Sequence, residues 1–239
     1  MPEAAEVQRL FARVASRYDL TNDVLSLGVH RAWRRRVVRA ARVGVGDRVL
    51  DVCCGTGDVA LALRATGARV VGVDFCMPML ARAAAKATGT GIRYAAGDAL
   101  RLPFPDATFD AATVAFGVRN LADPCAGLRE MVRVCRPGGR VVVLEFCRPR
   151  VPVVATLYGC YFRNVMPRLG AWVSGDRHGA YRYLQRTVEA FPERDAFLAW
   201  MRAAGLRDPG YTTVSFGIAA VYAGTVPEGA GAAGGGVPA

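Results

Sequence analysis

Hydrophobic residues near the N-terminus recur every three or four positions, which is the period of an amphipathic helix. The residues that share this face are Val7, Leu10, Phe11, Val14 and Tyr18. Asn22-Asp23 is expected to break the helix. The following segment, HRAWRRRVVRAARV, places its apolar residues on one face and its arginines elsewhere. Residues 1–42 are therefore predicted to be helical.

From residue 48 the pattern changes to short apolar runs that alternate with helical stretches. The runs expected to be strands are RVLDVC, RVVGVDF, IRYAAGD, FDAATVAF and RVVVLEF. The stretches expected to be helices are VALALRATG, MPMLARAAAKA and DPCAGLREMVRVCRPGG, the last ended by its glycines. Strands alternating with helices predict an α/β fold with a parallel sheet and right-handed crossovers.

The C-terminal third departs from this rhythm. Residues 148–192 are aromatic and basic and are interpreted as an insertion that covers the sheet. A helix is expected over 195–205, followed by two strands in YTTVSFGIAAVYAGT that are joined at Ser215–Gly217. Residues 225–239 are rich in Gly, Ala and Pro and are expected to be disordered. Residues 1–224 are therefore expected to form one domain.

Composition narrows the class of protein. The 239 residues are 52% hydrophobic, which suits a single α/β domain with a sizeable core. The most apolar stretch, 151–162, is shorter than the roughly 18 residues that a membrane-spanning helix needs. The N-terminus carries charges where a signal peptide needs an apolar run, so a cytoplasmic location is expected.

Cysteine usage and charge limit the chemistry. The seven cysteines show no C-x-x-C spacing, so they are interpreted as small buried hydrophobes, and neither a disulfide framework nor a metal site is expected. A net charge of +11 suggests nucleic acid, an anionic ligand or an anionic membrane surface. A nucleic-acid-binding module is an alternative, but the basic residues are scattered and no RNA-binding aromatic signature or zinc motif is present.

A glycine-rich loop carries the strongest chemical signal. Gly55, Thr56 and Gly57 lie between a predicted strand and a predicted helix. Glycine there lets the backbone approach a ligand closely, and the helix N-terminus offers unpaired N–H groups. The plainer interpretation is an ordinary tight turn. Asp51 precedes the loop, at the end of the strand, where it could contact the amino-acid part of a cofactor.

Two further acids follow the next two strands. Asp74 could accept the hydroxyl protons of a ribose, or it could cap the following helix. Asp98 could accept a hydrogen bond from an adenine amino group, or it could serve in a turn. GTGDVA also satisfies a looser dinucleotide fingerprint, so a nicotinamide-dependent oxidoreductase competes. Asp51, Asp98 and the RPGG-VVVLEF pattern at 136–146 favour a methyltransferase.

Longer motifs resemble one family. FARVASRYDLTNDVLSLGVHRAWRR and FGVRNLADPCAGLREMVRVCRPGG, together with VLEFCRP and AYRYLQRTVEAFP, are similar to the menaquinone/ubiquinone-biosynthesis C-methyltransferases. These belong to the class I S-adenosylmethionine-dependent superfamily, and the resemblance spans residues 6–224. It implies a Rossmann-like sheet of seven strands, six parallel and one antiparallel, with helices on both faces.

The resemblance also implies a cofactor and its contacts. The cofactor is S-adenosyl-L-methionine, and the positions expected to bind it are Gly55, Thr56, Gly57, Asp74, Asp98, Ala99 and Ala115. Ala115 stands where relatives often have serine. The lost hydroxyl removes at most one hydrogen bond, worth about 1 kcal/mol.

The implied reaction moves the methyl group to a ring carbon of a demethylated polyprenyl quinol. Demethylmenaquinol is the first interpretation of the acceptor; a ubiquinone-pathway benzoquinol or another small phenol remains an alternative. A quinol carbon becomes nucleophilic when a hydroxyl loses its proton, so the site needs a base or a cation that stabilises the phenolate.

Candidates for this role follow from position. Arg119 and Asn120 lie just beyond the fourth strand, and Arg119 could stabilise a phenolate or form a structural salt bridge. His30 could be the base, although a lone histidine is more often a packed or surface residue; His178 is a weaker candidate. Residues that could line a ring pocket, or belong to the core, are Tyr18, Tyr181 and Tyr183.

A polyprenyl acceptor implies contact with a membrane surface. The segment 151–172 is apolar and aromatic, and the arginines that could meet anionic lipid are Arg31, Arg34, Arg35, Arg36 and Arg39, at about 1 kcal/mol each. The plainer interpretation is a helix packed on the sheet and a solvated basic face. The expected location is thus cytoplasmic and peripheral at the inner membrane face; a homo-oligomer is left open.

Overall fold

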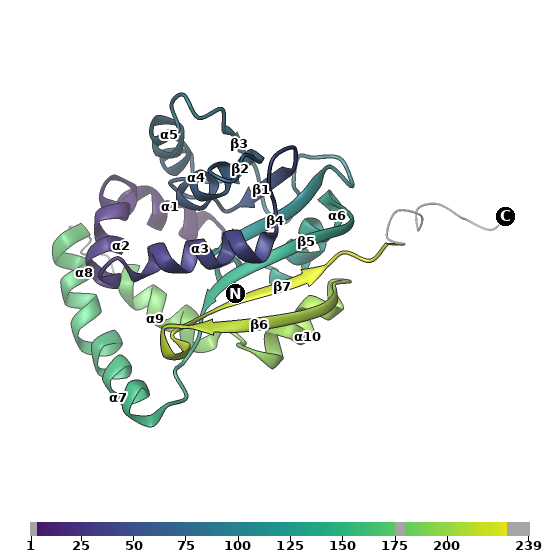
Figure 1. The fold of residues 1–239 in the computed structure, drawn as a ribbon. Coiled ribbons are helices and arrows are strands. Elements are labelled where there is room, and N and C mark those ends of the chain that lie inside the picture. Colours follow the sequence, from purple (N-terminus) through teal and green to yellow (C-terminus); the bar gives the residue numbers. More distant parts are fainter. Residues whose placement is uncertain (1–3, 175–179, 229–239) are drawn as a thin grey trace.

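The computed structural model describes residues 4–174 and 180–228 and contains a seven-stranded sheet in the order β3-β2-β1-β4-β5-β7-β6 (Figure 1). The strands are β1 Arg48–Val52, β2 Arg69–Asp74, β3 Arg93–Ala96, β4 Phe109–Ala115, β5 Cys135–Phe146, β6 Arg207–Val214 and β7 Ala219–Thr225. Only β7 among them runs antiparallel to its neighbours β5 and β6. The predicted fold class is confirmed.

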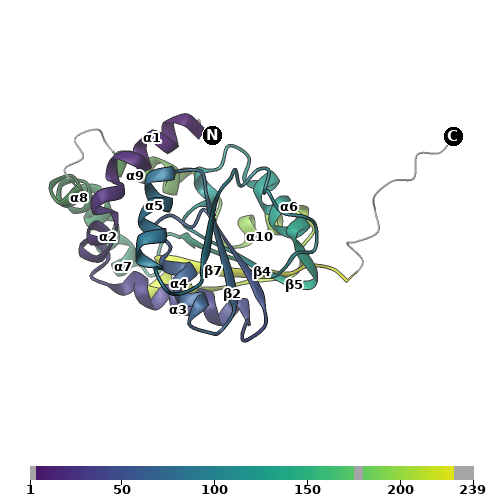
Figure 2. The same ribbon diagram turned by 90° about the horizontal axis from the view of Figure 1, so that it is seen from above.

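Helices cover both faces of the sheet (Figure 2). They are α3 Val29–Ala41, α4 Asp58–Arg64 and α5 Met77–Lys86 on one face, and α6 Pro124–Val134 and α10 Asp195–Ala203 on the other. Successive residues of β1 serve opposite faces, because Val49 packs with α3 and α4 while Leu50 packs with α6 and α10. Burial on both faces explains why the strands are continuous apolar runs rather than alternating ones.

The N-terminal helices differ from the prediction in where they break. They are α1 Ala4–Val14, a 3₁₀ turn η1 Ala15–Arg17 and α2 Tyr18–Ser26. Asn22 and Asp23 lie inside α2, so the predicted break there is wrong. The helix ends instead at Leu27, whose φ of 49° is left-handed, and at Gly28, whose amide donates to the Asp23 carbonyl at 3.0 Å.

Two predicted boundaries near the RPGG segment also move. Helix α6 ends at Val134 rather than at the glycines, and β5 begins at Cys135. The register between β4 and β5 shifts here, and a Cβ on Gly139 would lie 2.7 Å from the Arg136 carbonyl oxygen. Val226, expected to be disordered, is buried and exchanges backbone hydrogen bonds with Gly138 and Gly139. The predicted tail beyond residue 228 lies outside the described residues.

The insertion at 148–192 is helical where it is described. It contains α7 Pro152–Cys160, the π-helical turn η3 Tyr161–Val165, α8 Met166–Ser174 and α9 Ala180–Ala190. Helix α8 packs against α2 and α9, so the insertion and the N-terminal helices form one group beside the sheet (Figure 1). In the part of the chain that the structure describes, no helix has the length and apolarity to span a bilayer.

Candidate active site

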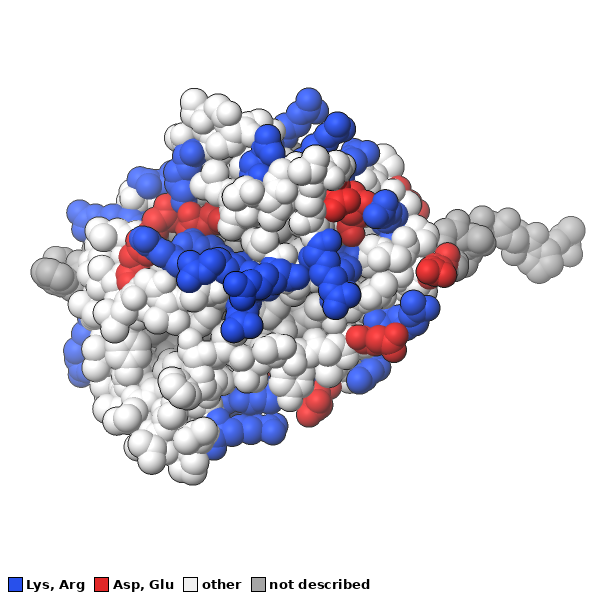
Figure 3. Space-filling view, viewed as in Figure 1, with Lys and Arg blue, Asp and Glu red and all other residues white. Residues whose placement is uncertain are grey.

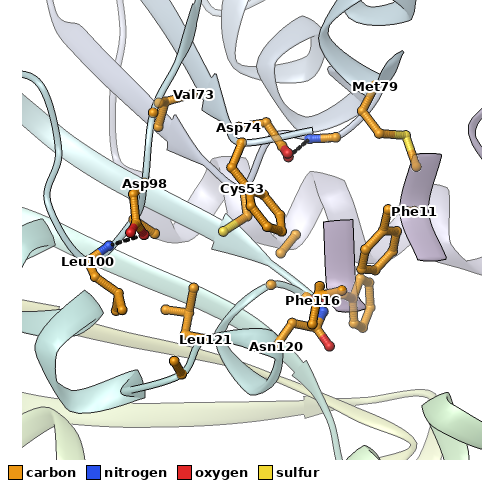
Figure 4. A pocket seen from close by; sticks show the side chains of 18 of the residues that line it. Phe11, Cys53, Val73, Asp74, Met79, Asp98, Leu100, Phe116, Asn120 and Leu121 are labelled. Atoms are coloured by element: carbon orange, nitrogen blue, oxygen red, sulfur yellow. Dashed lines mark hydrogen bonds between the residues drawn. The ribbon is translucent and has the colours of Figure 1, made fainter. Parts of the chain in front are cut away.

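Two connected cavities lie at the carboxyl ends of the central strands. The smaller, of about 170 Å³, is bounded by the ends of β1, β2 and β4, by the 97–100 loop and by α1 (Figure 4). The larger, of about 660 Å³, extends from the glycine loop between the N-terminal helices and the insertion. The strand order reverses between β1 and β4, and ligands of open α/β sheets bind at such a switch point.

The glycine loop connects β1 to α4 through left-handed backbone. Gly55 has a φ of 54° and lines both cavities. Gly57 has a φ of 81°, and a Cβ there would lie 2.4 Å from the Tyr94 hydroxyl, so any other residue would be strained at this position. Gly57 lines neither cavity. The structure gives Gly57 a place in shaping the loop, and its predicted contact with a cofactor stays a prediction.

Thr56 links the glycine loop to the N-terminal helices. Its buried hydroxyl donates to Asp19 Oδ1 at 2.5 Å. Lys86 Nζ bridges Asp19 Oδ2 at 2.8 Å and Asp58 Oδ1 at 2.5 Å, and Asp58 also binds Arg34. Thr56 lines the larger cavity, so this ion network fixes α2 and α3 over the loop next to the site.

Asp74 ends β2 and faces the smaller cavity. Oδ2 accepts the amide of Gly55 and Oδ1 that of Cys76, both at 2.8 Å. Burial raises the pKa of this carboxyl, and the backbone donors oppose the rise. Each carboxylate oxygen has two lone pairs. Asp74 can therefore shape the loop and still accept hydrogen bonds from a ligand.

Asp98 and two alanines complete the smaller cavity. Asp98 Oδ1 accepts the Leu100 amide at 2.9 Å, which is the predicted turn role, while its carboxylate borders the cavity (Figure 4). Ala99 lines the same cavity, and Ala115 lines both. The structure thus brings Gly55, Asp74, Asp98, Ala99 and Ala115 together around one space.

Asp51 lines the larger cavity and has one carboxylate oxygen without a close hydrogen-bond partner in the described part of the chain. Its Oδ1 accepts the Thr113 hydroxyl at 2.9 Å, whereas Oδ2 is buried with no partner among the described residues. Desolvation raises the pKa of this carboxyl to about 7. An unpaired carboxylate oxygen at the end of β1 fits the ammonium group of an amino-acid ligand. The residues present therefore fit S-adenosylmethionine.

Arg119 forms a buried ion pair and also lines the larger cavity. Its Nη1 donates to Glu145 Oε1 at 2.8 Å and to the Phe116 carbonyl at 2.5 Å, and its guanidinium lies 5.4 Å from the centre of the Phe146 ring. Burial raises the pKa of Glu145, and Arg119 opposes that rise. Arg119 Nε and Glu145 Oε2 have no partner among the described residues. The predicted salt bridge is present, and the guanidinium keeps a free donor.

Asn120 and two tyrosines form the wall between the cavities. Asn120 lines the smaller cavity and accepts a hydrogen bond from the Tyr183 hydroxyl at 3.1 Å. Tyr183 lines the larger cavity, and Tyr18 lines both. His178 and the side chain of Tyr181, both named as candidates from the sequence, lie outside what the structure describes.

His30 lines the larger cavity and lies at the start of α3. Its Nδ1 is 2.5 Å from Ser26 Oγ, and its Nε2 is 3.5 Å from Asp23 Oδ1. Burial, followed by the charge of Arg34, lowers the pKa of the imidazole below 6.5. At neutral pH the ring is therefore uncharged and able to accept a proton.

Several aromatic side chains of the larger cavity were not identified from the sequence. Trp33 and Phe146 both pack on Phe116, with ring centres 6.0 and 4.4 Å apart, and Tyr158 stacks on Phe162 at 5.4 Å. Periodicity cannot distinguish such a wall from a core. Glu145 was also missed, although a lone acid in the apolar run VVVLEF requires a buried cation.

Among the described residues no group of three or more His, Cys, Asp or Glu side chains is arranged to hold a metal ion.

Cys53 lines both cavities, and burial raises the pKa of its thiol. The thiol beside the site is therefore in its neutral form.

Comparison with known proteins places this site in a family context. The model of the ubiE/COQ5 methyltransferase family matches residues 2–226. A demethylmenaquinone methyltransferase of Deinococcus radiodurans is 51% identical over 222 residues, 91% of each chain. The ubiquinone/menaquinone biosynthesis C-methyltransferase UbiE of Bdellovibrio bacteriovorus is 42% identical over 231 residues, 94% of this chain and 97% of the relative. A SAM-dependent methyltransferase structure from Thermotoga maritima shares the fold, with a TM-score of 0.63 at 19% identity, covering 91% of this chain and 98% of that one.

Proposed function

This chain belongs to the ubiE/COQ5 methyltransferase family, and we propose that it transfers a methyl group from S-adenosylmethionine to a ring carbon of demethylmenaquinol, giving menaquinol. The observation that carries the proposal is the pair of cavities, one bordered by acids and one by aromatic rings, that share the residues Tyr18, Cys53 and Phe116. A methyl donor in the first and an acceptor ring in the second would meet at these residues.

The cofactor is assigned to the smaller cavity and the adjoining end of β1. Asp74 would accept hydrogen bonds from the ribose hydroxyls, Asp98 from the adenine amino group, and Asp51 would pair with the ammonium group. When bound, S-adenosylmethionine supplies an electrophilic methyl group, so the protein's own task is to place and activate the carbon that receives it. Thr56 and its ion network hold α2 over this position.

The acceptor is assigned to the larger cavity. Rings at Trp33, Phe116, Phe146 and Tyr158 offer flat apolar surfaces to a quinol, and aromatic pairs gain about 0.5–1.5 kcal/mol beyond area burial. The relative with 51% identity is named for demethylmenaquinone, and the one with 42% identity for both quinone pathways. This favours a naphthoquinol over a benzoquinol.

Activation of the ring requires removal of a hydroxyl proton. His30 is uncharged at neutral pH and faces the cavity, so it would accept this proton through Ser26 or directly. Arg119 would stabilise the phenolate with the donor that Glu145 leaves free. Asn120, held by Tyr183, would position the ring at the wall between the cavities. A bound acceptor would displace water from this cavity, which would strengthen these charge interactions.

A polyprenyl acceptor resides in a bilayer, and we place the protein at the membrane surface when it collects this substrate. The apolar lining of the larger cavity and the arginines of α3 support this location. Binding is peripheral, because the acceptor alone needs to enter the protein.

The test is a methyl-transfer assay with labelled S-adenosylmethionine and a short-chain demethylmenaquinol, with and without reductant. Only the reduced acceptor should be methylated, because the ring of the oxidised quinone is electron-poor. Equal rates on the oxidised quinone would overturn the proposed chemistry. Cells without the gene should accumulate the demethylated quinone, and the identity of that quinone separates the naphthoquinol from the benzoquinol.

A further inference from the structure

The larger cavity opens at a rim whose most exposed side chains are apolar. Leu27, Val29 and Phe216 all line this cavity, yet Leu27 is 88% and Phe216 79% exposed. Leu27 follows α2, and Phe216 lies in the turn between β6 and β7. Trp33 Nε1 donates to Ser215 Oγ at 2.8 Å, which ties that turn to α3. The two apolar tips therefore flank the same opening.

The local fold does not require large apolar side chains at these tips. Leu27 has a φ of 49° and Phe216 a φ of 57°, in the left-handed region where Gly and Asn are the usual residues. A leucine or phenylalanine there combines an unfavourable backbone conformation with exposed hydrocarbon. Both side chains are therefore free to make a contact outside the chain.

Helix α7 extends the apolar surface beside the opening. Val153 and Leu157 lie one turn apart and are 69% and 67% exposed, while the adjacent Tyr158 lines the cavity. Residues 148–174 contain no Asp or Glu. Helix α7 itself carries no charged residue, so its exposed face next to the cavity is largely hydrocarbon.

A band of positive charge borders this surface. Helix α3 carries five arginines and no carboxylate, and Arg35, Arg36 and Arg39 are exposed. Figure 3 shows this band of Lys and Arg above a largely uncharged, hollowed surface that includes α7. Hydrocarbon tips bordered by cations match the acyl chains and headgroups of an anionic membrane.

We propose that Leu27, Phe216 and the outer face of α7 insert into an anionic bilayer, with the arginines of α3 at headgroup level, so that the larger cavity opens directly into the lipid. The proposed insertion rests on the proposed function, because an opening into the lipid gives a polyprenyl acceptor a path that avoids water. A second copy of the chain fits less well, since it would bring the same arginine band against itself.

Vesicle binding tests the rim directly. Leu27→Asn/Phe216→Asn removes both apolar tips and should keep the fold, because Asn tolerates a positive φ; thermal unfolding checks this. Sedimentation with vesicles of phosphatidylglycerol and phosphatidylcholine should show a partition coefficient at least tenfold below wild type. Val45→Asn is the matched control, because Val45 is 89% exposed but precedes β1, at the opposite end of the strands. Its partition coefficient should be unchanged.

An activity comparison separates this inference from the proposed function. Val153→Gln/Leu157→Gln lies outside the cavity, and Gln favours a helix. It should slow methylation of long-chain demethylmenaquinol in vesicles several-fold while leaving the rate on a short-chain soluble analogue unchanged. Unaltered vesicle binding by both double variants would overturn the docking surface. So would a concentration-dependent dimer that Leu27→Asn/Phe216→Asn disperses. If wild type methylates neither quinol yet binds vesicles through the rim, the proposed function fails and the surface stands.

Discussion

Arg119 Nη1 donates to Glu145 Oε1 at 2.8 Å, and both side chains are buried where β4 and β5 end. A buried cation needs this partner, because an unpaired charge is expensive to keep away from water. The pair also fixes the guanidinium beside the larger cavity, and its Nε has no partner among the described residues. The structural role of Arg119 therefore does not exclude the proposed functional one.

Arg119→Met should destabilise the protein by about 3–5 kcal/mol, because it leaves Glu145 buried without its cation. Arg119→Met/Glu145→Gln removes both charges and should recover most of that loss in urea unfolding. Turnover of the double variant should still fall by about 10²-fold, with S-adenosylmethionine affinity nearly intact, if the guanidinium stabilises the phenolate.

Lysine at position 119 should restore part of the rate, because it supplies a point charge in place of a planar fork. If instead the stable double variant turns over normally, Arg119 has a structural role alone. In that case the phenolate is stabilised elsewhere, and His30 becomes the first residue to test.

The α/β fold class could be predicted from the sequence, because alternating strands and helices leave a local pattern. The structure brings most of the predicted cofactor residues to one edge of the sheet, and their binding role stays a prediction. Apolar runs followed by Gly or Asp identified the ends of β1 and β2, and parallel strands bring those ends to one edge. The acceptor side was predictable only in part. Glu145 meets Arg119, and Phe116 and Tyr158 line one cavity, only because distant segments come together. The spacing of these residues in the sequence is equally compatible with an ordinary core.

The ends of the helices were also hard to predict from local sequence. Asn22-Asp23 looked like a helix break, yet α2 continues through it, because the break depends on Leu27 and Gly28 adopting left-handed backbone. Local propensity gave no reason to expect this of a leucine. Leu27 is exposed at the opening of the larger cavity, and this position follows from the packing of distant segments.

Asp51 predicts a pH dependence of cofactor binding. Its pKa is raised to about 7, so the carboxyl is protonated below that pH and ionised above it. An ammonium group pairs only with the ionised form. The affinity for S-adenosylmethionine, measured by calorimetry, should therefore fall as pH drops from 8 to 5, by up to about tenfold per pH unit below the pKa.

Asp51→Asn is the control for this pH dependence, because it keeps the shape and the Thr113 hydrogen bond but cannot ionise. It should bind the cofactor more weakly at pH 8 and lose most of the dependence on pH. A variant with the wild-type pH profile would exclude Asp51 from the cofactor site.

Asp74 distinguishes the cofactor class. The protein should bind S-adenosylmethionine and its demethylated product but not NAD. Asp74→Ala should weaken S-adenosylmethionine binding by about 1–3 kcal/mol, since the ribose hydroxyls and the amides of Gly55 and Cys76 all lose a charged acceptor. Calorimetry that detected NAD binding and no S-adenosylmethionine binding would reject the cofactor assignment, and an unchanged affinity would remove Asp74 from the site.

Membrane binding should depend on charge through α3. Wild type should sediment with anionic vesicles more than with neutral ones, and 0.5 M salt should weaken the binding. Arg35→Gln/Arg39→Gln should lower binding to anionic vesicles, whereas Arg82→Gln/Arg202→Gln, an equal change of charge on α5 and α10, should not. Equal binding to neutral and anionic vesicles at all salt levels would contradict the electrostatic contribution.

His30 predicts the acid limb of the pH–rate profile. Burial and Arg34 disfavour the imidazolium, while Asp23 and Asp58 favour it, and the net result is a pKa below 6.5. A base of this kind is active above its pKa and is lost by protonation below it. The kcat for reduced demethylmenaquinol should therefore be flat near neutral pH and fall about tenfold per pH unit under acid conditions.

His30→Gln separates this role from a structural one, because glutamine can keep a hydrogen bond to Ser26 but cannot take up a proton at these pH values. It should lower kcat by about 10²-fold near neutral pH and abolish the acid limb, with S-adenosylmethionine affinity unchanged. Ser26→Ala is the companion variant: if the proton passes through the hydroxyl, its kcat falls while the acid limb remains, since the imidazole still titrates. A His30→Gln enzyme with the wild-type profile would show that the base is another group.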